Sequence, residues 1–76
     1  MIQVKEIEAS RDHVLHVVFE NGEKRRFDLK PYLQRGVFRE LQNENYFKLV
    51  KNRGYFVEWP NEQDLSADTL YLEGQK

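Results

Sequence analysis

The stretch that decides the fold is Trp59-Pro60-Asn61-Glu62-Gln63-Asp64-Leu65-Ser66-Ala67-Asp68-Thr69-Leu70-Tyr71, close to the C-terminal end of the chain. A β-rich run precedes it and ends at Pro60, because proline has no N–H to give to a strand ladder. Ser66 suits the N-cap of a helix, and Asp68 suits the positive dipole end of its first turn. Gly74 suits the end of that helix. The stretch therefore predicts a strand, a turn and a short final helix.

The same stretch supplies residues that we expect to hold this part of the domain together. Trp59 is expected to be buried at the base of the sheet, against Tyr71 and the final helix, since aromatic side chains bury a large area. Asp64 is expected to lie in the turn and accept hydrogen bonds from loop amides. The residues with such structural roles are Trp59, Pro60, Asn61, Asp64, Ser66, Asp68 and Tyr71.

A hairpin is predicted upstream, in the N-terminal half of the chain. His13 to Glu20 alternates apolar side chains between two faces, which indicates a strand, and Glu23 to Leu29 returns antiparallel. The Asn21-Gly22 pair favours a two-residue turn, because Gly accepts positive φ without penalty and Asn tolerates it. A first strand, Ile2 to Ala9, changes its apolar phase near Lys5-Glu6, which indicates a bulge or a strand end.

Short helical turns are predicted to follow this hairpin. Asp28 can cap a turn that has Pro31 near its beginning, where a missing N–H costs little. A second turn is predicted over Val37 to Leu41. Asn43-Glu44-Asn45 is typical of a polar break, and Tyr46 to Lys51 fits either a helix or a strand.

A second hairpin completes the predicted fold. The Asn52-Arg53-Gly54 turn and the run Tyr55 to Trp59 favour it. We therefore predict an α+β domain on a mainly antiparallel sheet of about five strands, in the order β-β-β, short helices, β-hairpin and a C-terminal short helix. One sheet face should meet the helical segments, and the other, which carries His16 and Arg26, is either exposed or an interface.

The length and composition limit the class of protein. Residues 1–76 predict a single small domain, whose thin core is supported by ten aromatic side chains. Cysteine is absent, which excludes disulfides and thiolate ligands and fits a reducing compartment. No apolar run approaches the ~20 residues of a membrane span, and no signal pattern opens the chain. We therefore expect a cytoplasmic protein with no membrane contact.

Charge is segregated along the chain although the net charge is only −1. Residues 24–53 carry +6, while residues 1–23 carry −3 and residues 54–76 carry −4. The folded domain either presents a basic face and an acidic face, or cancels these charges by internal pairing.

The sequence resembles the small prokaryotic family called domain of unknown function 2442 over nearly its whole length. The residues that carry the resemblance are Leu15-x-Val17-x-Phe19-x-Asn21-Gly22-Glu23, Arg26-Phe27-Asp28-Leu29, Gly36-Val37-Phe38-x-x-Leu41, Phe47 and Trp59-Pro60-Asn61-x-x-Asp64-Leu65-Ser66-x-Asp68-x-Leu70-Tyr71. The last of these segments is the most specific. The chain departs from the family pattern at Glu62, since the family usually has Gly soon after Trp-Pro-Asn.

The resemblance implies an α+β fold and a bacterial origin, and it implies no activity, because none is assigned to the family. Members occur alone, fused to a helix-turn-helix DNA-binding domain, or encoded beside another small protein in a toxin–antitoxin-like pair. Because this chain ends at Lys76, we expect it to lack such a DNA-binding domain.

Two patterns in the sequence resemble parts of metal sites. Asp64, Ser66 and Asp68 have the spacing that opens an EF-type calcium loop, but the Gly and Glu that such a loop needs later are absent. His13 and His16 are three residues apart, which places them on opposite faces of a strand. We therefore expect no bound metal.

Catalytic patterns are also missing from the sequence. Nucleophilic catalysis needs an activated side chain with a base in reach, and only Ser10, Ser66 and Thr69 are available as hydroxyl nucleophiles. The four glycines are scattered rather than gathered into a phosphate-binding loop. We expect neither an enzyme nor a cofactor.

The leading hypothesis is a non-catalytic protein–protein interaction module, with another small protein as its partner in a toxin–antitoxin-like pair. The predicted contact charges are Arg25, Arg26, Arg35 and Arg39. The alternative is an auxiliary, regulatory nucleic-acid-binding domain that uses the same basic segment, because cations engage phosphates and aromatic rings stack on bases. The aromatic residues near that segment are Tyr32, Tyr46 and Tyr55. The oligomeric state is left open by the sequence.

Overall fold

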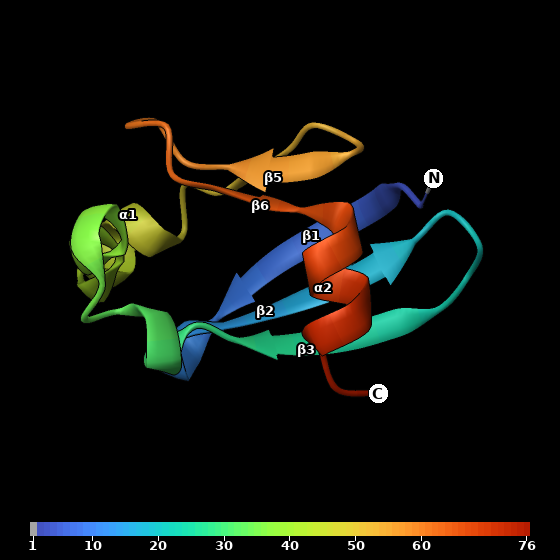
Figure 1. Ribbon diagram of the computed structural model, residues 1–76, viewed down its shortest axis with the longest axis horizontal. Helices are drawn as coiled ribbons and strands as arrows, with labels where there is room; N and C mark the ends of the chain where they lie inside the picture. Colours follow the sequence, from blue (N-terminus) through green and yellow to red (C-terminus); the bar gives the residue numbers. More distant parts are fainter. Residues whose placement is uncertain (1) are drawn as a thin grey trace.

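Two three-stranded antiparallel sheets and several short helices form the α+β fold (Figure 1). The computed structural model describes residues 2–76. The strands are β1 (Val4–Ser10), β2 (Val14–Phe19), β3 (Lys24–Asp28), β4 (Lys51–Asn52), β5 (Phe56–Glu58) and β6 (Asp64–Ser66). The helical segments are η1 (Arg11–His13), η2 (Lys30–Tyr32), η3 (Gly36–Gln42), α1 (Glu44–Phe47) and α2 (Ala67–Glu73). The strand orders are β1-β2-β3 and β4-β5-β6.

The predicted single sheet of about five strands is not confirmed, because the two sheets do not share a continuous ladder. Within residues 2–76 the one backbone hydrogen bond between them runs from Val4 N to Gly54 O, at 2.7 Å. The Asn52 side chain then occupies the place of further ladder bonds, since its Nδ2 donates to the carbonyls of Val4 and Lys5. The prediction also placed Asp64 in a turn, whereas it begins β6.

The N-terminal hairpin is confirmed, but its turn has three residues rather than two. Phe19 N donates to Glu23 O at 2.8 Å, and Gly22 N donates to Phe19 O at 2.9 Å. Gly22 has a φ of +88°, while Asn21 keeps a negative φ and uses its side-chain oxygen to accept from Glu23 N. This is a type I turn followed by a left-handed residue, the usual three-residue hairpin connection. The bulge expected near Lys5-Glu6 is confirmed by a register shift between Val4 and Glu6.

The same turn geometry recurs between β5 and β6, with a different residue in the left-handed position. Trp59 N donates to Gln63 O at 2.9 Å, and Glu62 N donates to Trp59 O at 3.0 Å. Glu62 has a φ of +74°, the position that Gly22 occupies in the first hairpin. A side chain costs free energy there because Cβ approaches the following carbonyl oxygen.

Replacing Glu62 by Gly is expected to stabilise the fold by about 1 kcal/mol, since Gly adopts this backbone conformation without strain. Chemical denaturation of the purified chain measures the change. Glu44→Gly is the matched control. Glu44 lies in α1, where the same substitution is expected to lower the free energy of unfolding by up to about 1 kcal/mol. An unchanged or lower midpoint for Glu62→Gly would refute the strain at this position.

The segment predicted as a polar break is the start of a helix. Asn43 is the N-cap of α1, and its side-chain oxygen accepts from the backbone N–H groups of Asn45 and Tyr46. Tyr46 and Phe47, whose state the sequence left open, are therefore helical. The turn expected near Pro31 and the turn expected over Val37 to Leu41 are both present, as the 3₁₀ helices η2 and η3.

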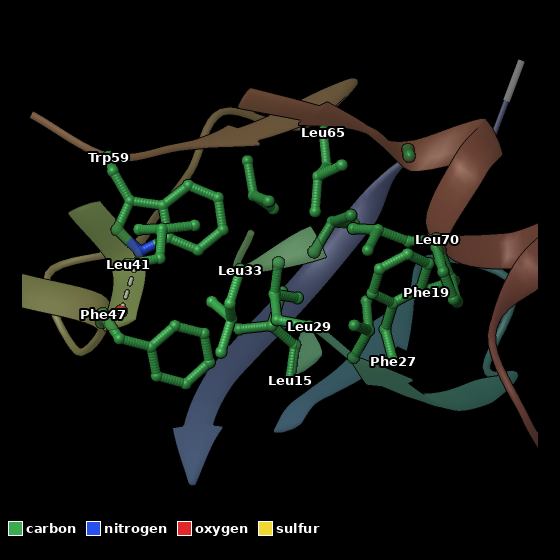
Figure 2. Packing of buried hydrophobic residues seen from close by; sticks show 14 residues of the cluster. Leu15, Phe19, Phe27, Leu29, Leu33, Leu41, Phe47, Trp59, Leu65 and Leu70 are labelled. Atoms are coloured by element: carbon green, nitrogen blue, oxygen red, sulfur yellow. Dashed lines mark hydrogen bonds between the residues drawn. The ribbon is translucent and has the colours of Figure 1, made fainter. Parts of the chain in front are cut away.

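The core lies between the inner face of the first sheet, the second sheet and the helices (Figure 2). Trp59 is buried as predicted, with 1% of its surface exposed. Its neighbour is not Tyr71, as predicted, but Phe47, whose ring stacks on the indole at 6.2 Å and whose carbonyl accepts the indole N–H at 2.8 Å. Tyr71 instead packs edge-on against Phe19, at the end of the core where Leu70 lies. The two aromatic groups thus close opposite ends of one core.

The final helix begins and ends as predicted. Ser66 Oγ accepts from Thr69 N at 3.1 Å, and α2 ends before Gly74. Gly74 has an ordinary φ of −72°, so the backbone conformation does not require glycine here. The missing side chain matters instead, because an added Cβ would lie 2.4 Å from Leu70 O and 2.9 Å from Arg25 Cβ. This close approach lets Gln75 pair with Arg26 at the edge of β3.

Gly74→Ala is therefore expected to destabilise the fold by about 1–3 kcal/mol, because the new methyl group forces α2 away from β3. The free energy of unfolding from chemical denaturation measures this loss. Gln75→Ala, which removes an exposed side chain from the next residue, should leave the stability unchanged. Equal stability of the two variants would contradict the close-packing role of Gly74.

Candidate interaction surface

The four arginines predicted to contact a partner occupy different environments. Arg25 points into the protein, with only 7% of its surface exposed. Its Nε donates to Tyr71 O at 3.1 Å, its Nη1 to Lys24 O at 2.9 Å and its Nη2 to Glu23 Oε1 at 3.1 Å. The guanidinium also lies over the Tyr71 ring, 4.3 Å from its centroid. Arg25 is thus a structural residue, and the prediction that it offers its charge to a partner does not fit this burial.

Glu23 completes the cluster around Arg25. Its Oε2 accepts a hydrogen bond from the Tyr71 hydroxyl at 2.5 Å, while Oε1 forms the ion pair with Arg25. The hydrogen bond from Tyr71, followed by the hydrogen bond from Arg25, lowers the pKa of Glu23 below its ordinary value of 4.5. The charged form of Glu23 is therefore favoured by folding.

Because the folded-state pKa of Glu23 is lowered, its contribution to stability is present above pH 4.5 and is lost as the pH falls through the lowered value. Glu23→Gln should therefore lower the free energy of unfolding at pH 7. The difference between the variant and the unmodified chain should be smaller at about pH 3 than at pH 7. Urea denaturation at both pH values measures it. Glu20→Gln, at an exposed residue of the same hairpin, is the control; an equal Glu23→Gln deficit at both pH values would refute the linkage.

Arg26 and Arg35 share one open groove beside β3. Arg26 is exposed on β3, and Arg35 follows η2, with its guanidinium over the Tyr32 ring at 5.3 Å from the centroid. The groove is lined by Val14, Arg26, Phe27, Asp28, Pro31, Tyr32, Arg35, Glu73 and Gln75. The structure thus brings together two of the four predicted contact arginines.

The carboxylates of this groove already have partners within the protein. Asp28 Oδ1 accepts from Lys30 N at 2.8 Å and lies 3.2 Å from Lys30 Nζ. Partial burial raises the pKa of Asp28, but the hydrogen bonds from Lys30 outweigh it, so that the pKa is lowered overall. Glu73 Oε1 accepts from the Tyr32 hydroxyl at 3.1 Å, and burial, together with this bond to Glu73, raises the pKa of Tyr32. Neither carboxylate forms an ion pair with Arg26 or Arg35 in the part of the chain that the structure describes.

Arg39 lies apart from the other predicted contact residues. It is exposed on η3, does not line the groove, and makes no ion pair within residues 2–76. The basic run Lys24-Arg25-Arg26 is divided by strand alternation, since Lys24 and Arg26 are exposed and Arg25 is buried. The accessible positive charge is therefore carried by separate elements rather than by one cluster.

A buried polar network near the final turn was missed by the sequence reasoning. Gln63 is 2% exposed; its Oε1 accepts from the Tyr46 hydroxyl at 2.7 Å, and its Nε2 donates to Glu40 Oε1 at 3.0 Å. Asn61 joins it, because its N–H donates to the Tyr46 hydroxyl and its Nδ2 to Glu40 Oε2. No local pattern distinguishes Gln63 from its exposed polar neighbours, since its partners lie about twenty residues away in the chain.

The model of one protein family matches residues 4–76, essentially the whole chain. The protein belongs to the family described as protein of unknown function (DUF2442). No curated protein and no solved structure matches the chain at a significant level. The most specific segment of the DUF2442 resemblance is the one that supplies the buried Trp59, the turn that contains Glu62, and the N-cap Ser66.

The residues that were weighed as metal ligands in this DUF2442 chain have structural surroundings. His13 packs its ring against Phe47, 5.1 Å between centroids, and His16 is exposed beside Ser10, with 3.0 Å from Nε2 to Oγ. Ser66 caps α2. Among residues 2–76, no three or more His, Asp or Glu side chains gather in a way that could hold a metal ion. None of the helices in this described range is long and apolar enough to cross a membrane.

Proposed function

We propose that this DUF2442 protein is a non-catalytic interaction module that binds another small protein as one member of a toxin–antitoxin-like pair in the bacterial cytoplasm. The observation that carries the proposal is the groove beside β3, where Arg26 and Arg35 form no ion pair with another described residue. Asp28 pairs with Lys30 and Glu73 accepts a hydrogen bond from the Tyr32 hydroxyl, so neither carboxylate holds the two arginines, and both guanidinium groups are available to a partner.

The chemistry of the groove suits an acidic segment of the partner. Arginine forms bidentate hydrogen bonds with carboxylates, and Arg26 and Arg35 approach the groove from different elements. Pro31 and Tyr32 also line the groove and add apolar surface to it. Arg39, exposed on η3, adds a further charge that steers an acidic partner during the encounter.

An auxiliary nucleic-acid-binding role is the alternative, and one observation favours it. Tyr55 and Phe56 expose 49% and 37% of their surface, and exposed aromatic rings can stack on bases. The adjacent cation, Arg53, is however paired with Glu58 at 2.7 Å. This pairing, together with the net charge of −1, makes the protein partner the better supported of the two.

The tagged chain should recover one small protein from the native host's lysate in near-equal amount, and nuclease treatment should not change the recovery. Arg35→Glu combined with Arg39→Glu should weaken binding of the identified partner at least about tenfold, mainly through slower association. Mass spectrometry identifies the partner, and surface plasmon resonance with the purified pair measures the rates. Lys48→Glu combined with Lys51→Glu makes the same change in net charge elsewhere and should bind normally.

Unchanged binding after the Arg35 and Arg39 substitutions would contradict the proposed contact charges. Recovery that collapses with nuclease would instead support the nucleic-acid alternative. In that case oligonucleotide binding should fall steeply with salt, because binding releases counterions from the phosphates.

A further inference from the structure

The outer face of the first sheet carries charge in an ordered pattern. Strand alternation turns one set of side chains of β2 and β3 toward the core, apolar except for Arg25, and leaves the other set outside. The register places the outer residues in three rows across β1, β2 and β3, namely Glu6, Val18 and Lys24; Glu8, His16 and Arg26; and Ser10, Val14 and Asp28. Each of the first two rows therefore begins with an acid on β1 and ends with a base on β3.

These charges are not neutralised within the chain. In the described residues 2–76, Glu6, Glu8, Lys24 and Arg26 take part in no ion pair. The acids and bases lie two strands apart, roughly 9–10 Å between backbones, so they are not cross-strand neighbours. The strip of β2 between them holds the half-buried Val18 and the exposed His16. A shallow hollow lies here, lined in part by Glu8, His16 and Lys24.

We infer that this face binds a second copy of the same chain. A two-fold axis parallel to the strands, lying between two stacked sheets, exchanges the β1 and β3 sides and keeps each row in place. It sets Glu6 against Lys24 of the second copy and Glu8 against Arg26 of the second copy. The two-fold symmetry repeats each pair, so Glu6, Glu8, Lys24 and Arg26 of each copy all meet opposite charges. Asp28, which pairs with Lys30 of its own chain, meets Ser10 of the second copy.

The middle of the face, on β2, is also matched by this arrangement. Val18 meets Val18 of the second copy, and His16 meets His16 of the second copy, because β2 lies on the axis. The other face-to-face two-fold, perpendicular to the strands, stacks β1 on β1 and sets Glu8 against acids. Charge complementarity therefore selects one orientation of the two copies.

The size of the face sets the strength of this association. A standard interface uses about 20–30 residues on each side, and this face offers about a third of that number. We therefore expect a weak dimer, with a dissociation constant in the micromolar-to-millimolar range. Because the charges are exposed, added salt should weaken it further. This inference goes beyond the proposed function, since it is tested on the purified chain alone. Arg26 belongs both to this face and to the groove beside β3, so a second copy and the proposed partner compete for its guanidinium.

A charge-swap experiment tests the arrangement. Sedimentation equilibrium of the unmodified chain up to about 1 mM should give a concentration-dependent dimer. Glu6→Lys with Glu8→Lys, and separately Lys24→Glu with Arg26→Glu, should each weaken self-association at least about tenfold, since each variant sets like charges against each other. The two variants mixed in equal amounts should form a heterodimer, because all four ion pairs are then restored. The chain that carries all four substitutions should again form a homodimer.

Controls separate this specific pairing from general attraction of net charge. The Lys48→Glu and Lys51→Glu variant has the same net charge as the Lys24→Glu and Arg26→Glu variant, but its changes lie off the face. Mixed with the Glu6→Lys and Glu8→Lys variant, it should form less heterodimer than the charge-swapped pair, because only two of the four facing pairs are then of opposite charge. A monomeric unmodified chain at about 1 mM, a charge-swapped mixture no better than this control, or four-fold substitution without a homodimer would each overturn the inference.

Discussion

The buried guanidinium of Arg25 is the interaction on which the rest of the domain depends. A charged group removed from water is costly unless it is paired and hydrogen-bonded, and Arg25 satisfies this requirement with Glu23 and the carbonyls of Lys24 and Tyr71. Three of these groups lie in or beside β3, and Tyr71 lies in α2. The cluster therefore fastens the final helix over the inner face of the first sheet, where Figure 1 shows α2 in front of β2 and β3.

The position of α2 in turn builds the groove that carries the proposed function. Glu73 at the end of α2 accepts from Tyr32, and Gln75 pairs with Arg26 at the edge of β3. Both contacts need the chain to pass close to Arg25, which the absent side chain of Gly74 permits. The arginines thus have different roles. Arg25 holds the wall of the groove in place, while Arg26 and Arg35 line the groove with their charged side chains.

Local structure was largely predictable, and the reason is visible in particular residues. The alternation of β2, the N-cap Ser66 and the turn at Gly22 each depend on neighbours within a few residues. One local error concerns the first turn, which has three residues rather than two, since the pairing of Phe19 with Glu23 was not evident from Asn21-Gly22 alone. The other errors come from contacts between residues far apart in the chain. Of the predicted site, Arg26 and Arg35 meet in one groove, but Arg25 is buried and Arg39 lies elsewhere.

The sequence by itself determined the α+β class, the three N-terminal strands, the later hairpin, the final helix, and the division of charge between the basic middle and the acidic ends, because these follow from short-range patterns and composition. The tertiary structure decided which residues meet across the fold. It separated the strands into two sheets through Asn52, paired Trp59 with Phe47, and buried Gln63 and Arg25. Each of these outcomes joins residues far apart in the chain, and the free energy of burial that selects them depends on packing that no local pattern records.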